Sequence, residues 1–318
     1  MKLVVITGCL GLIGNYVTRK CLDKGWKVYG IDKMTYAANK WALEEFKKNK
    51  NFTFVNKDIC NLESLPDCDY LINIAAESHV ENSIIESDVF MKSNILGVKN
   101  LLNIIKNKHA NVFKRPVFLH FSTDEVYGDI KAGAHTEQDI LKPSNPYSAS
   151  KAAADMLILA WARTYDLEYL IVRPTNNYGI GQYCEKLIPL SVKLLSLGRK
   201  INLHDKGNPV RNWLHAEDTA DAVIKLIESG KVNDIFNISG NLEQKNYVTA
   251  TKIVKAFNPA YTEDEIHSCF NLQHVRKGQD VRYSLDDTKI RALGWDNKKH
   301  FDNEIQDIVD YYKENFKW

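Results

Sequence analysis

Two adjacent carboxyl side chains, Asp124 and Glu125, are the residues of this sequence best suited to acid–base chemistry on a single substrate. Neighbouring carboxyls are costly unless they do separate jobs or share a proton, which pushes their pKa values apart. Adjacent side chains of a regular strand point to opposite faces. Both can therefore act on one substrate only if the chain turns at Asp124, for example into a short helix. A solvated acidic loop is the alternative interpretation.

A glycine-rich segment near the N-terminus predicts a dinucleotide site. Gly8, Gly11 and Gly14 follow a short apolar run and precede a predicted helix. Glycines there allow a tight turn, close approach of the backbone to a pyrophosphate, and close packing of the helix on a sheet. The N–H groups of the first helical turn, which contains Leu12 and Ile13, then face the phosphates. The spacing is GxxGxxG rather than the commoner GxGxxG, and a flexible turn is the alternative interpretation.

The residue that ends the second predicted strand, Asp32, indicates which dinucleotide binds. Its carboxylate can accept hydrogen bonds from the adenosine ribose, and it would repel a 2′-phosphate. This favours NAD over NADP, although the cation of Lys33 could tolerate a phosphate. Asp58, at the end of the third predicted strand, is placed to meet the edge of the adenine. We therefore predict that NAD is the cofactor.

A tyrosine and a lysine four positions apart, Tyr147 and Lys151, complete the candidate chemistry. Pro146 fits the first turn of a helix, and residues at this spacing share a helix face. The lysine ammonium and the positive charge of a nicotinamide would favour the phenolate. Both charges would thus lower the pKa of Tyr147 towards that of a useful general base. A surface helix pair is the alternative interpretation.

Composition excludes several classes of partner. Among 318 residues, 42 are basic and 40 acidic, so no basic face for nucleic acid is expected. No apolar run reaches membrane-spanning length. The six cysteines are scattered without CxxC pairs, which argues against zinc and against a disulfide framework. Free thiols are typical of a reducing compartment, and we expect a cytoplasmic protein with no metal.

Short apolar runs alternate with helical patterns through the first half of the chain, as expected for strands buried on both faces of a parallel sheet. The predicted strands are Lys2–Thr7, Lys27–Asp32, Phe52–Asp58, Tyr70–Ala76, Val117–Thr123 and Tyr169–Pro174. The predicted helices between them are Leu12–Lys24, Ile84–Lys108 and Pro146–Tyr165. This rhythm predicts an α/β fold with a Rossmann-type doubly wound parallel sheet.

The regular alternation weakens after Pro174, which predicts a smaller mixed α/β substrate domain. A helix is expected near Glu185–Leu197, and a helix followed by a strand at Ala216–Glu228 and Ile235–Ser239. The last two elements predict that the chain returns to the first domain. We expect an NAD-binding domain at 1–175 plus about 211–240, and a nucleotide-sugar-binding domain at about 176–210 and 241–318.

Taken together, these segments resemble the extended short-chain dehydrogenase/reductase family, and within it the nucleoside-diphosphate-glucose 4,6-dehydratases. The segments that carry the resemblance are Ala75-Ala76-Glu77-Ser78-His79-Val80, Ser122-Thr123-Asp124-Glu125-Val126-Tyr127-Gly128, Tyr147-Ser148-Ala149-Ser150-Lys151, Asn176-Asn177-Tyr178-Gly179, Glu185-Lys186-Leu187-Ile188-Pro189, Arg211-Asn212-Trp213-Leu214 and Asp280-Val281-Arg282-Tyr283. Related epimerases and decarboxylases share the glycines and the tyrosine–lysine pair but not the Thr-Asp-Glu triplet. The triplet therefore decides the subclass.

The resemblance implies a three-step dehydration with NAD held throughout. Tyr147 would take the proton of the sugar 4-OH while NAD accepts hydride from C4, with Thr123 bonded to the oxygen. Glu125 would then abstract the C5 proton, and protonated Asp124 would assist loss of the C6 hydroxyl as water. Hydride would finally return to C6, giving a 4-keto-6-deoxy sugar nucleotide.

The resemblance also implies which residues bind the cofactor and the substrate. Cofactor contacts are implied for Gly8, Gly11, Leu12, Ile13, Gly14, Asp32, Lys33, Thr35, Asp58, Ile59, Ala75, Ala76, Ser93, Tyr147, Lys151 and Asn177. Substrate contacts are implied for Ser78, Thr123, Asn176, Lys186, Leu187, Asn202, His204, Arg211, Arg276 and Tyr283. Arg211 and Arg276 would hold the diphosphate through their guanidinium forks, with surface salt bridges as the alternative.

Several positions depart from the bacterial dTDP-glucose pattern. The chain has Leu203-His204-Asp205 where that group usually has Tyr-Gly after a proline, and Gln279 where histidine is frequent. Tyr183-Cys184 replaces a phenylalanine–proline pair, and Cys9 lies in the first loop. A histidine at position 204 is more similar to the UDP-glucose 4,6-dehydratases of eukaryotic rhamnose synthesis. These departures favour UDP-glucose over dTDP-glucose as the substrate.

Other activities on the same fold remain open: a 4-epimerase, a decarboxylase, a 4,6-dehydratase that also inverts C5, or a non-catalytic NAD-binding protein. An epimerase would leave Asp124 and Glu125 without a task. The helices at Ile84–Lys108 and Pro146–Tyr165 carry apolar residues on more than one face. In the family such helices pack as a four-helix bundle, which implies a homodimer, whereas a well-buried helix pair is the alternative.

Overall fold

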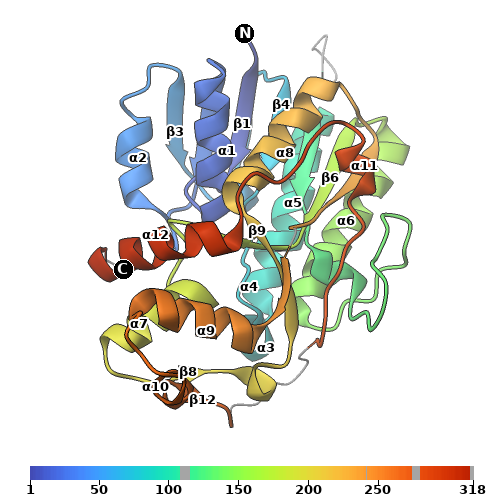
Figure 1. Cartoon of the computed structure of the whole chain (residues 1–318). Helices are drawn as coiled ribbons and strands as arrows, with labels where there is room; N and C mark the ends of the chain where they lie inside the picture. Colours follow the sequence, from blue (N-terminus) through green and yellow to red (C-terminus); the bar gives the residue numbers. More distant parts are fainter. Residues whose placement is uncertain (108–114, 241, 274–279, 316–318) are drawn as a thin grey trace.

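The computed structural model describes residues 1–107, 115–240, 242–273 and 280–315. In this part of the chain the largest element is a sheet of seven parallel strands in the order β10-β6-β5-β4-β1-β2-β3 (Figure 1). These strands are β1 (Leu3–Thr7), β2 (Lys27–Asp32), β3 (Phe52–Asn56), β4 (Tyr70–Asn73), β5 (Val117–Phe121), β6 (Tyr169–Pro174) and β10 (Asp234–Ile238). The order confirms the predicted Rossmann-type doubly wound sheet.

Helices cover both faces of this sheet, and a separate apolar core fills each layer. α1 (Leu12–Asp23) and α8 (Ala216–Ser229) pack together on one face. α5 (Gly97–Asn107) and α6 (Pro146–Tyr165) lie on the other (Figure 1). Because the strands are buried between two helical layers, their side chains are apolar on both faces, and Val4, Val5 and Ile6 are completely buried. This burial explains the continuous apolar runs in the sequence.

The remaining elements form a second, smaller part with its own sheets. β7 (Asn176–Tyr178), β9 (Val210–His215) and β11 (Leu242–Lys245) make a three-stranded sheet, and β8 (Ile201–Asn202) pairs with β12 (Phe270–Asn271). The helices and short turns not yet named are α2 (Lys40–Phe46), η1 (Ile59–Asn61), η4 (Asp124–Tyr127), α7 (Leu187–Ser196), η5 (His204–Gly207), α9 (Asn246–Phe257), α10 (Glu263–Ser268), α11 (Thr288–Arg291) and α12 (Phe301–Glu314). β10 returns the chain to the main sheet, and the exact domain boundaries stay a prediction.

Three predicted strands are longer than the real ones. β3 ends at Asn56, β4 at Asn73 and β5 at Phe121, two or three residues before the predicted ends. Beyond these points the chain leaves the sheet to build loops: Asp58 instead caps η1 by accepting a hydrogen bond of 2.9 Å from the N–H of Cys60. The helix predicted from Glu185 begins only at Leu187, because Lys186 has an extended backbone.

The single helix predicted for Ile84–Lys108 is wrong, and Lys108 itself lies outside the described residues. The segment contains α3 (Val80–Ile85), the turn α4 (Asp88–Phe90), a π-helical turn η2 (Met91–Leu96) and α5. A π turn contains an extra residue and so redirects the side chains around it. Here Asn94 is fully buried and its amide bonds the N–H and the carbonyl of Glu77, at 2.9 and 3.0 Å. These bonds explain why a regular helix is interrupted.

α6 matches its predicted bounds because its start is specified by local chemistry. Asn145 accepts a hydrogen bond of 2.9 Å from the N–H of Ser148, and Ser148 interacts in return with the backbone of Asn145. Pro146 occupies the first turn, as predicted. The helix ends at Asp166, whose backbone is left-handed. No helix among the described residues is long and apolar enough to span a membrane.

A buried ion pair joins α6 to the sheet. Asp155 of α6 accepts hydrogen bonds of 2.9 and 3.1 Å from Arg173 of β6, and both side chains are almost completely buried. Arg173 also donates to the hydroxyl of Tyr127, at 2.7 Å. Removing one partner of such a pair leaves an uncompensated buried charge, which is far costlier than losing an exposed pair.

We therefore expect Asp155→Ala to destabilise the protein by roughly 3–5 kcal/mol. The measurement is the melting temperature by circular dichroism, which should fall by several degrees. The matched control is Asp310→Ala, which removes an exposed carboxylate 3.3 Å from Lys313 and should change stability by less than about 1 kcal/mol. Equal melting temperatures for the two variants would contradict this account of the buried pair.

Candidate active site

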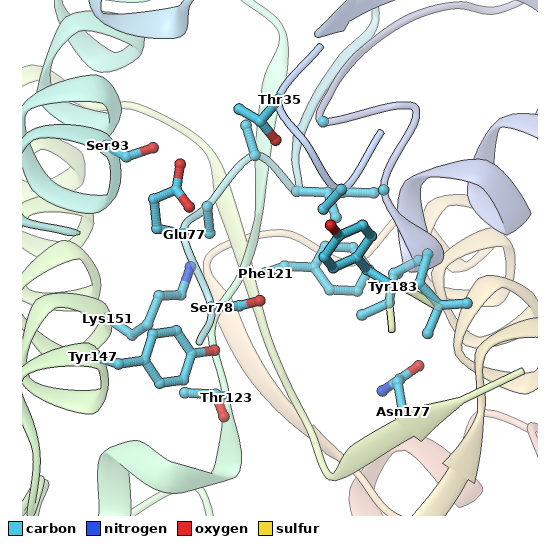
Figure 2. Close-up of a pocket in the computed structure, with 18 of the residues that line it drawn as sticks. Thr35, Glu77, Ser78, Ser93, Phe121, Thr123, Tyr147, Lys151, Asn177 and Tyr183 are labelled. Atoms are coloured by element: carbon cyan, nitrogen blue, oxygen red, sulfur yellow. The ribbon is translucent and has the colours of Figure 1, made fainter. Parts of the chain in front are cut away.

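A cavity of about 330 Å³ opens at the carboxyl edge of the main sheet, where ligands of open α/β sheets bind (Figure 2). Its walls come from the ends of neighbouring strands and the loops that follow them. Gly8 directly follows β1, Asp32 ends β2, Ser122 directly follows β5 and Pro174 ends β6. One cavity therefore collects side chains from segments that are far apart in the sequence.

Most of the predicted site residues line this cavity. They are Gly8, Gly11, Leu12, Ile13, Asp32, Lys33, Thr35, Asp58, Ile59, Ala75, Ala76, Ser78, Ser93, Thr123, Asp124, Glu125, Tyr147, Lys151, Asn176, Asn177 and Lys186. The predicted cofactor residues lie towards the ends of β1 and β2, and the predicted catalytic residues towards β5 and α6. The structure thus brings the glycine segment, the carboxyl pair and the tyrosine–lysine pair into one space.

Six predicted residues do not line the cavity, and their neighbours explain why. Gly14 lies inside α1, behind the glycine loop, and Leu187 packs in the cores of the smaller part. Asn202 is exposed and bonds to Asn271, and the Nε2 of His204 lies 2.9 Å from the carboxylate of Glu81 in α3. The remaining two are Arg211 and Tyr283, described next. Arg276 and Gln279 lie outside the described residues.

Arg211, predicted to hold a diphosphate, is almost completely buried beside Tyr283. Its guanidinium lies over the Tyr283 ring at 4.6 Å and donates to the carbonyl of Asp280 at 3.2 Å. The Tyr283 hydroxyl in turn donates to the carboxylate of Asp280 and lies 3.5 Å from Glu125. In this arrangement Arg211 supports the residues behind the carboxyl pair. Diphosphate binding by Arg211 and substrate contact by Tyr283 stay predictions.

The chain does turn at the carboxyl pair, as predicted. η4 begins at Asp124, directly after β5, and both carboxyl groups face the same cavity. Burial, followed by the charge of Glu125, raises the pKa of Asp124 to about 7. One Asp124 oxygen accepts a hydrogen bond of 3.1 Å from Thr123, and the other is buried and has no partner among the described residues. Asp124 can therefore carry a proton near neutral pH.

Glu125 occupies a more polar position than Asp124. The side-chain amide of Asn145 lies 3.4 Å from its carboxylate, and the Tyr283 hydroxyl lies 3.5 Å from the same oxygen. The Asn145 amide can donate a hydrogen bond to this carboxylate, whereas the Tyr283 hydroxyl gives its proton to Asp280. The two neighbouring carboxyls therefore have different surroundings, which suits one as an acid and the other as a base.

The prediction that the pKa of Tyr147 is lowered is wrong for the protein by itself. Burial and the charge of Glu125 raise the pKa of Tyr147, and the hydrogen bond with Thr123 only partly offsets them. Burial lowers the pKa of Lys151 to about 8. The amine of Lys151 lies 3.4 Å from the ring of the fully buried His120. Tyr147 and Lys151 share the cavity-facing side of α6, so the predicted geometry is correct although the predicted pKa direction is not (Figure 2).

The glycine loop fits a pyrophosphate. Gly8 has a φ of 68°, and a Cβ there would lie 2.6 Å from the backbone nitrogen of Ala75, so only glycine fits. α1 begins at Leu12, and no side chain caps its N-terminus, which opens on the cavity. Free N–H groups at a helix start attract phosphate. Asp32 accepts hydrogen bonds from the N–H groups of Leu10 and Met34, at 3.0 and 2.8 Å, so its carboxylate is held at the cavity edge.

Comparison with known proteins agrees with this geometry. The family model described as GDP-mannose 4,6 dehydratase matches residues 5–308. The chain is 37% identical to the dTDP-glucose 4,6-dehydratase of Haemophilus influenzae, over 98% of both proteins. The chain belongs to the nucleotide-sugar 4,6-dehydratase family. The crystal structure of the dTDP-glucose 4,6-dehydratase of Streptomyces venezuelae with NAD bound superposes with a TM-score of 0.92, at 34% identity, over 99% of this chain and 98% of that one.

A plant relative of this dehydratase is also similar. The chain is 34% identical, over its whole length, to 48% of a trifunctional UDP-glucose 4,6-dehydratase/UDP-4-keto-6-deoxy-D-glucose 3,5-epimerase/UDP-4-keto-L-rhamnose-reductase of Arabidopsis thaliana. Relatives of this dehydratase are thus named for both dTDP-glucose and UDP-glucose.

The cavity of the dehydratase also contains residues that the sequence did not single out. Glu77 forms an ion pair of 2.9 Å with Lys33, and Gln182 and Tyr183 also line the cavity; Figure 2 shows Tyr183 on the side opposite Tyr147 and Lys151. Glu77 lies between Ala76 and Ser78 in the sequence. Both neighbours were predicted as site residues, so this position could have indicated that Glu77 also belongs to the site. Its partner could not be predicted, because Lys33 follows a different strand. The pair also neutralises the cation that could have tolerated the 2′-phosphate of NADP.

We expect Gly14→Ala in this dehydratase to weaken retention of the dinucleotide. A Cβ at position 14 would lie 1.9 Å from the carbonyl oxygen of Gly8, so the glycine loop must move. Overpacking of this kind costs roughly 1–3 kcal/mol, which corresponds to a roughly five- to 150-fold change in an equilibrium constant. The measurement is the NAD content of the purified variant. The control is Gly133→Ala, where a Cβ meets no atom within 4 Å and NAD content should not change.

Proposed function

We propose that this chain removes water from a nucleoside-diphosphate glucose and forms the 4-keto-6-deoxy sugar nucleotide. The observation that carries this proposal is the pair of carboxyl groups at the end of β5. Asp124, with a pKa of about 7, and Glu125 face the same cavity as Tyr147 and Lys151. A dehydration needs an acid for the departing hydroxyl and a separate base for the carbon-bound proton, and this site offers both.

We propose NAD as the bound cofactor. The uncapped start of α1 fits the pyrophosphate, Asp32 fits the adenosine ribose, and Asp58 and Ile59 lie at the adenine end of the cavity. Crystal structures of similar dehydratases contain NAD. When bound, NAD accepts a hydride from C4 of the sugar and returns it to C6. The cofactor therefore needs no outside oxidant and can stay in place.

The residues of the chain supply the proton transfers. The phenolate of Tyr147, stabilised by the Lys151 ammonium and by the positive charge that a bound nicotinamide would add, receives the proton of the sugar 4-OH and becomes the phenol. Thr123, which hydrogen-bonds Tyr147, orients the same hydroxyl. Glu125 accepts the C5 proton, and Asp124 donates its proton to the C6 hydroxyl as that group leaves. Ser78, Asn176 and Lys186 line the sugar side of the cavity.

For the nucleotide we propose UDP, with dTDP as the second candidate. A histidine at position 204 resembles the UDP-glucose dehydratases of the rhamnose pathway, and its Nε2 lies 2.9 Å from the carboxylate of Glu81 in α3. The second candidate is favoured by the names of several similar bacterial proteins. In neither case does the structure place His204 in the described cavity.

The test is to incubate the purified protein separately with UDP-glucose and dTDP-glucose, without added cofactor, and to follow the product by mass spectrometry. Loss of one water from either substrate is expected, and the faster substrate identifies the nucleotide. Unchanged mass in both cases, even with NAD supplied, would contradict the dehydratase and favour a 4-epimerase or a non-catalytic NAD-binding protein. Release of CO₂ from a nucleoside-diphosphate glucuronic acid would instead indicate a decarboxylase.

We also propose that the protein is a cytoplasmic homodimer. Large apolar side chains are exposed on neighbouring helical elements beside α5 and α6: Ile84, Ile85, Val89, Leu96 and Met156. A second copy packing helices against this face would remove them from water. The six cysteines are free thiols, in keeping with a reducing compartment. A monomeric mass in solution at micromolar concentration would contradict the dimer.

A further inference from the structure

Lys33 and Glu77 are the two ends of an ion pair that joins opposite walls of the cavity. Lys33 follows the last residue of β2, and Glu77 follows β4. Their charged atoms are 2.9 Å apart, and the side chains are only 32% and 16% exposed. Burial by itself lowers the pKa of Lys33, but the hydrogen bond and charge of Glu77 outweigh it and raise that pKa. Lys33 is therefore charged at neutral pH.

The Lys33–Glu77 ion pair passes across the end of β1. β1 lies between β4 and β2 in the sheet, and the glycine loop from Gly8 to Gly11 leaves the end of β1. A bond from the end of β2 to the end of β4 must therefore span the end of β1. The glycine loop is where a dinucleotide pyrophosphate binds. The ion pair thus connects the two sides of the groove in which the dinucleotide lies.

Each end of the pair is held by its own backbone contacts. The N–H and carbonyl of Glu77 both bond the buried amide of Asn94 in the π turn, and Asn94 also donates to the Ser150 hydroxyl of α6 at 2.9 Å. Lys33 lies between Asp32 and Met34, and the Asp32 carboxylate accepts a hydrogen bond of 2.8 Å from the N–H of Met34. Because the backbone at Lys33 and at Glu77 is already held in place, little conformational entropy is lost when the two residues pair. The ion pair is therefore preorganised.

A second connection closes the neighbouring part of the groove. In the loop after β2, the Asn39 amide donates to the carbonyl of Gly181 at 2.9 Å. In the same loop the Tyr36 hydroxyl donates to the carboxylate of Glu185 at 3.2 Å, and the Tyr36 ring contacts that of Tyr183. This loop is thus tied to the segment that follows β7, while Lys33 is tied to the segment that follows β4. Figure 2 shows Glu77 on the side of the cavity that carries Ser93 and Lys151.

We propose that Glu77 and Lys33 form a strap across the dinucleotide groove that slows release of NAD from this chain. The strap rests on the proposed binding of NAD. In a dehydratase, the hydride taken from the substrate is returned within the same turnover. The cofactor need not be exchanged between turnovers, so slow release of NAD does not limit the rate. Glu77 is a positioning residue in this proposal, because it acts by holding Lys33 over the bound dinucleotide.

The experiment compares NAD release from the unmodified holoenzyme, Lys33→Met, Glu77→Gln and the double variant. Each protein is purified with its bound NAD and mixed with excess alcohol dehydrogenase and ethanol, so that every NAD released is reduced and read by its fluorescence. Each single variant should release NAD roughly three- to tenfold faster, the range for a partly buried ion pair. The double variant should be no faster than either single variant, because either substitution by itself already removes the ion pair.

The matched control is the surface pair of Lys24, which directly follows α1, and Glu228 of α8, whose charged atoms are 2.7 Å apart. Lys24→Met and Glu228→Gln should release NAD at the unmodified rate. Equal release from all the proteins, or single effects that multiply in the double variant, would overturn the strap. An unmodified protein that is purified without NAD would instead contradict the proposed function as well.

The unmodified holoenzyme gives a second test that needs no folded variant. Salt screens a partly exposed ion pair, so raising the ionic strength should accelerate NAD release. Glu77→Gln should show a smaller dependence on salt than the unmodified protein. If the release rate of the unmodified protein does not change between low and high salt, the strap is not electrostatic and the proposal fails.

Discussion

Glu125→Gln is expected to lower the rate of dehydration by about two to four orders of magnitude. Glutamine keeps the shape of glutamate and can remain near Asn145 and Tyr283, but it cannot accept the C5 proton. The loss should therefore appear in kcat, with little change in the NAD content of the purified protein. The measurement is the rate of water loss from the sugar nucleotide by mass spectrometry.

The control is Glu44→Gln, on the exposed face of α2, where the carboxylate pairs only with Lys47 at the surface. This variant should turn over at the unmodified rate. Full dehydration by Glu125→Gln would show that another group takes the C5 proton, and it would contradict the role proposed for Glu125.

The second large effect concerns Asp124 and pH. Its pKa of about 7 means that the carboxyl is protonated below that pH and ionised above it. Only the protonated form can give a proton to the departing C6 hydroxyl. We therefore expect kcat/KM to fall about tenfold per pH unit above pH 7. Asp124→Asn should lower kcat by about two to four orders of magnitude and should lack this decline, since the amide does not titrate.

The same pKa also makes a prediction about stability. Between the unfolded value near 4 and the folded value of about 7, the folded protein binds the proton of Asp124 more tightly than the unfolded chain does. Stability therefore decreases as pH rises through this window. Asp124→Asn should raise the melting temperature more at pH 8 than at pH 4. An equal shift at both pH values would show that Asp124 is not the buried acid that the pH–rate profile reports.

Local patterns were sufficient to predict the sheet and many of the site residues. The apolar runs at β1, β2 and β6 reflect burial on both sides, and the bounds of β2 and β6 agree with prediction. Pro146, together with the spacing of Tyr147 and Lys151, predicted the helix that presents them. Such signals lie within a few residues of one another. They can therefore be recognised in the sequence without knowledge of the fold.

Predictions failed where distant segments meet. The long helix after Ile84 is interrupted because Asn94 bonds to the backbone of Glu77, 17 positions earlier in the chain. The pKa of Tyr147 is raised because the folded chain buries it beside Glu125, which a helical spacing cannot reveal. Arg211 is buried against Tyr283 instead of lining the described cavity.

The sequence by itself predicted the glycine loop, the carboxylate proposed for the ribose, the proposed acid–base residues and the helix that presents two of them. Each depends on a residue type at a strand end or at a helical spacing. Only the tertiary structure decided that Lys33 pairs with Glu77 and that Asp124, unlike Glu125, is fully desolvated. The physical reason is that pairing and desolvation depend on which strand ends become neighbours. The order of strands in the sheet sets those neighbours, and the order of residues in the chain does not.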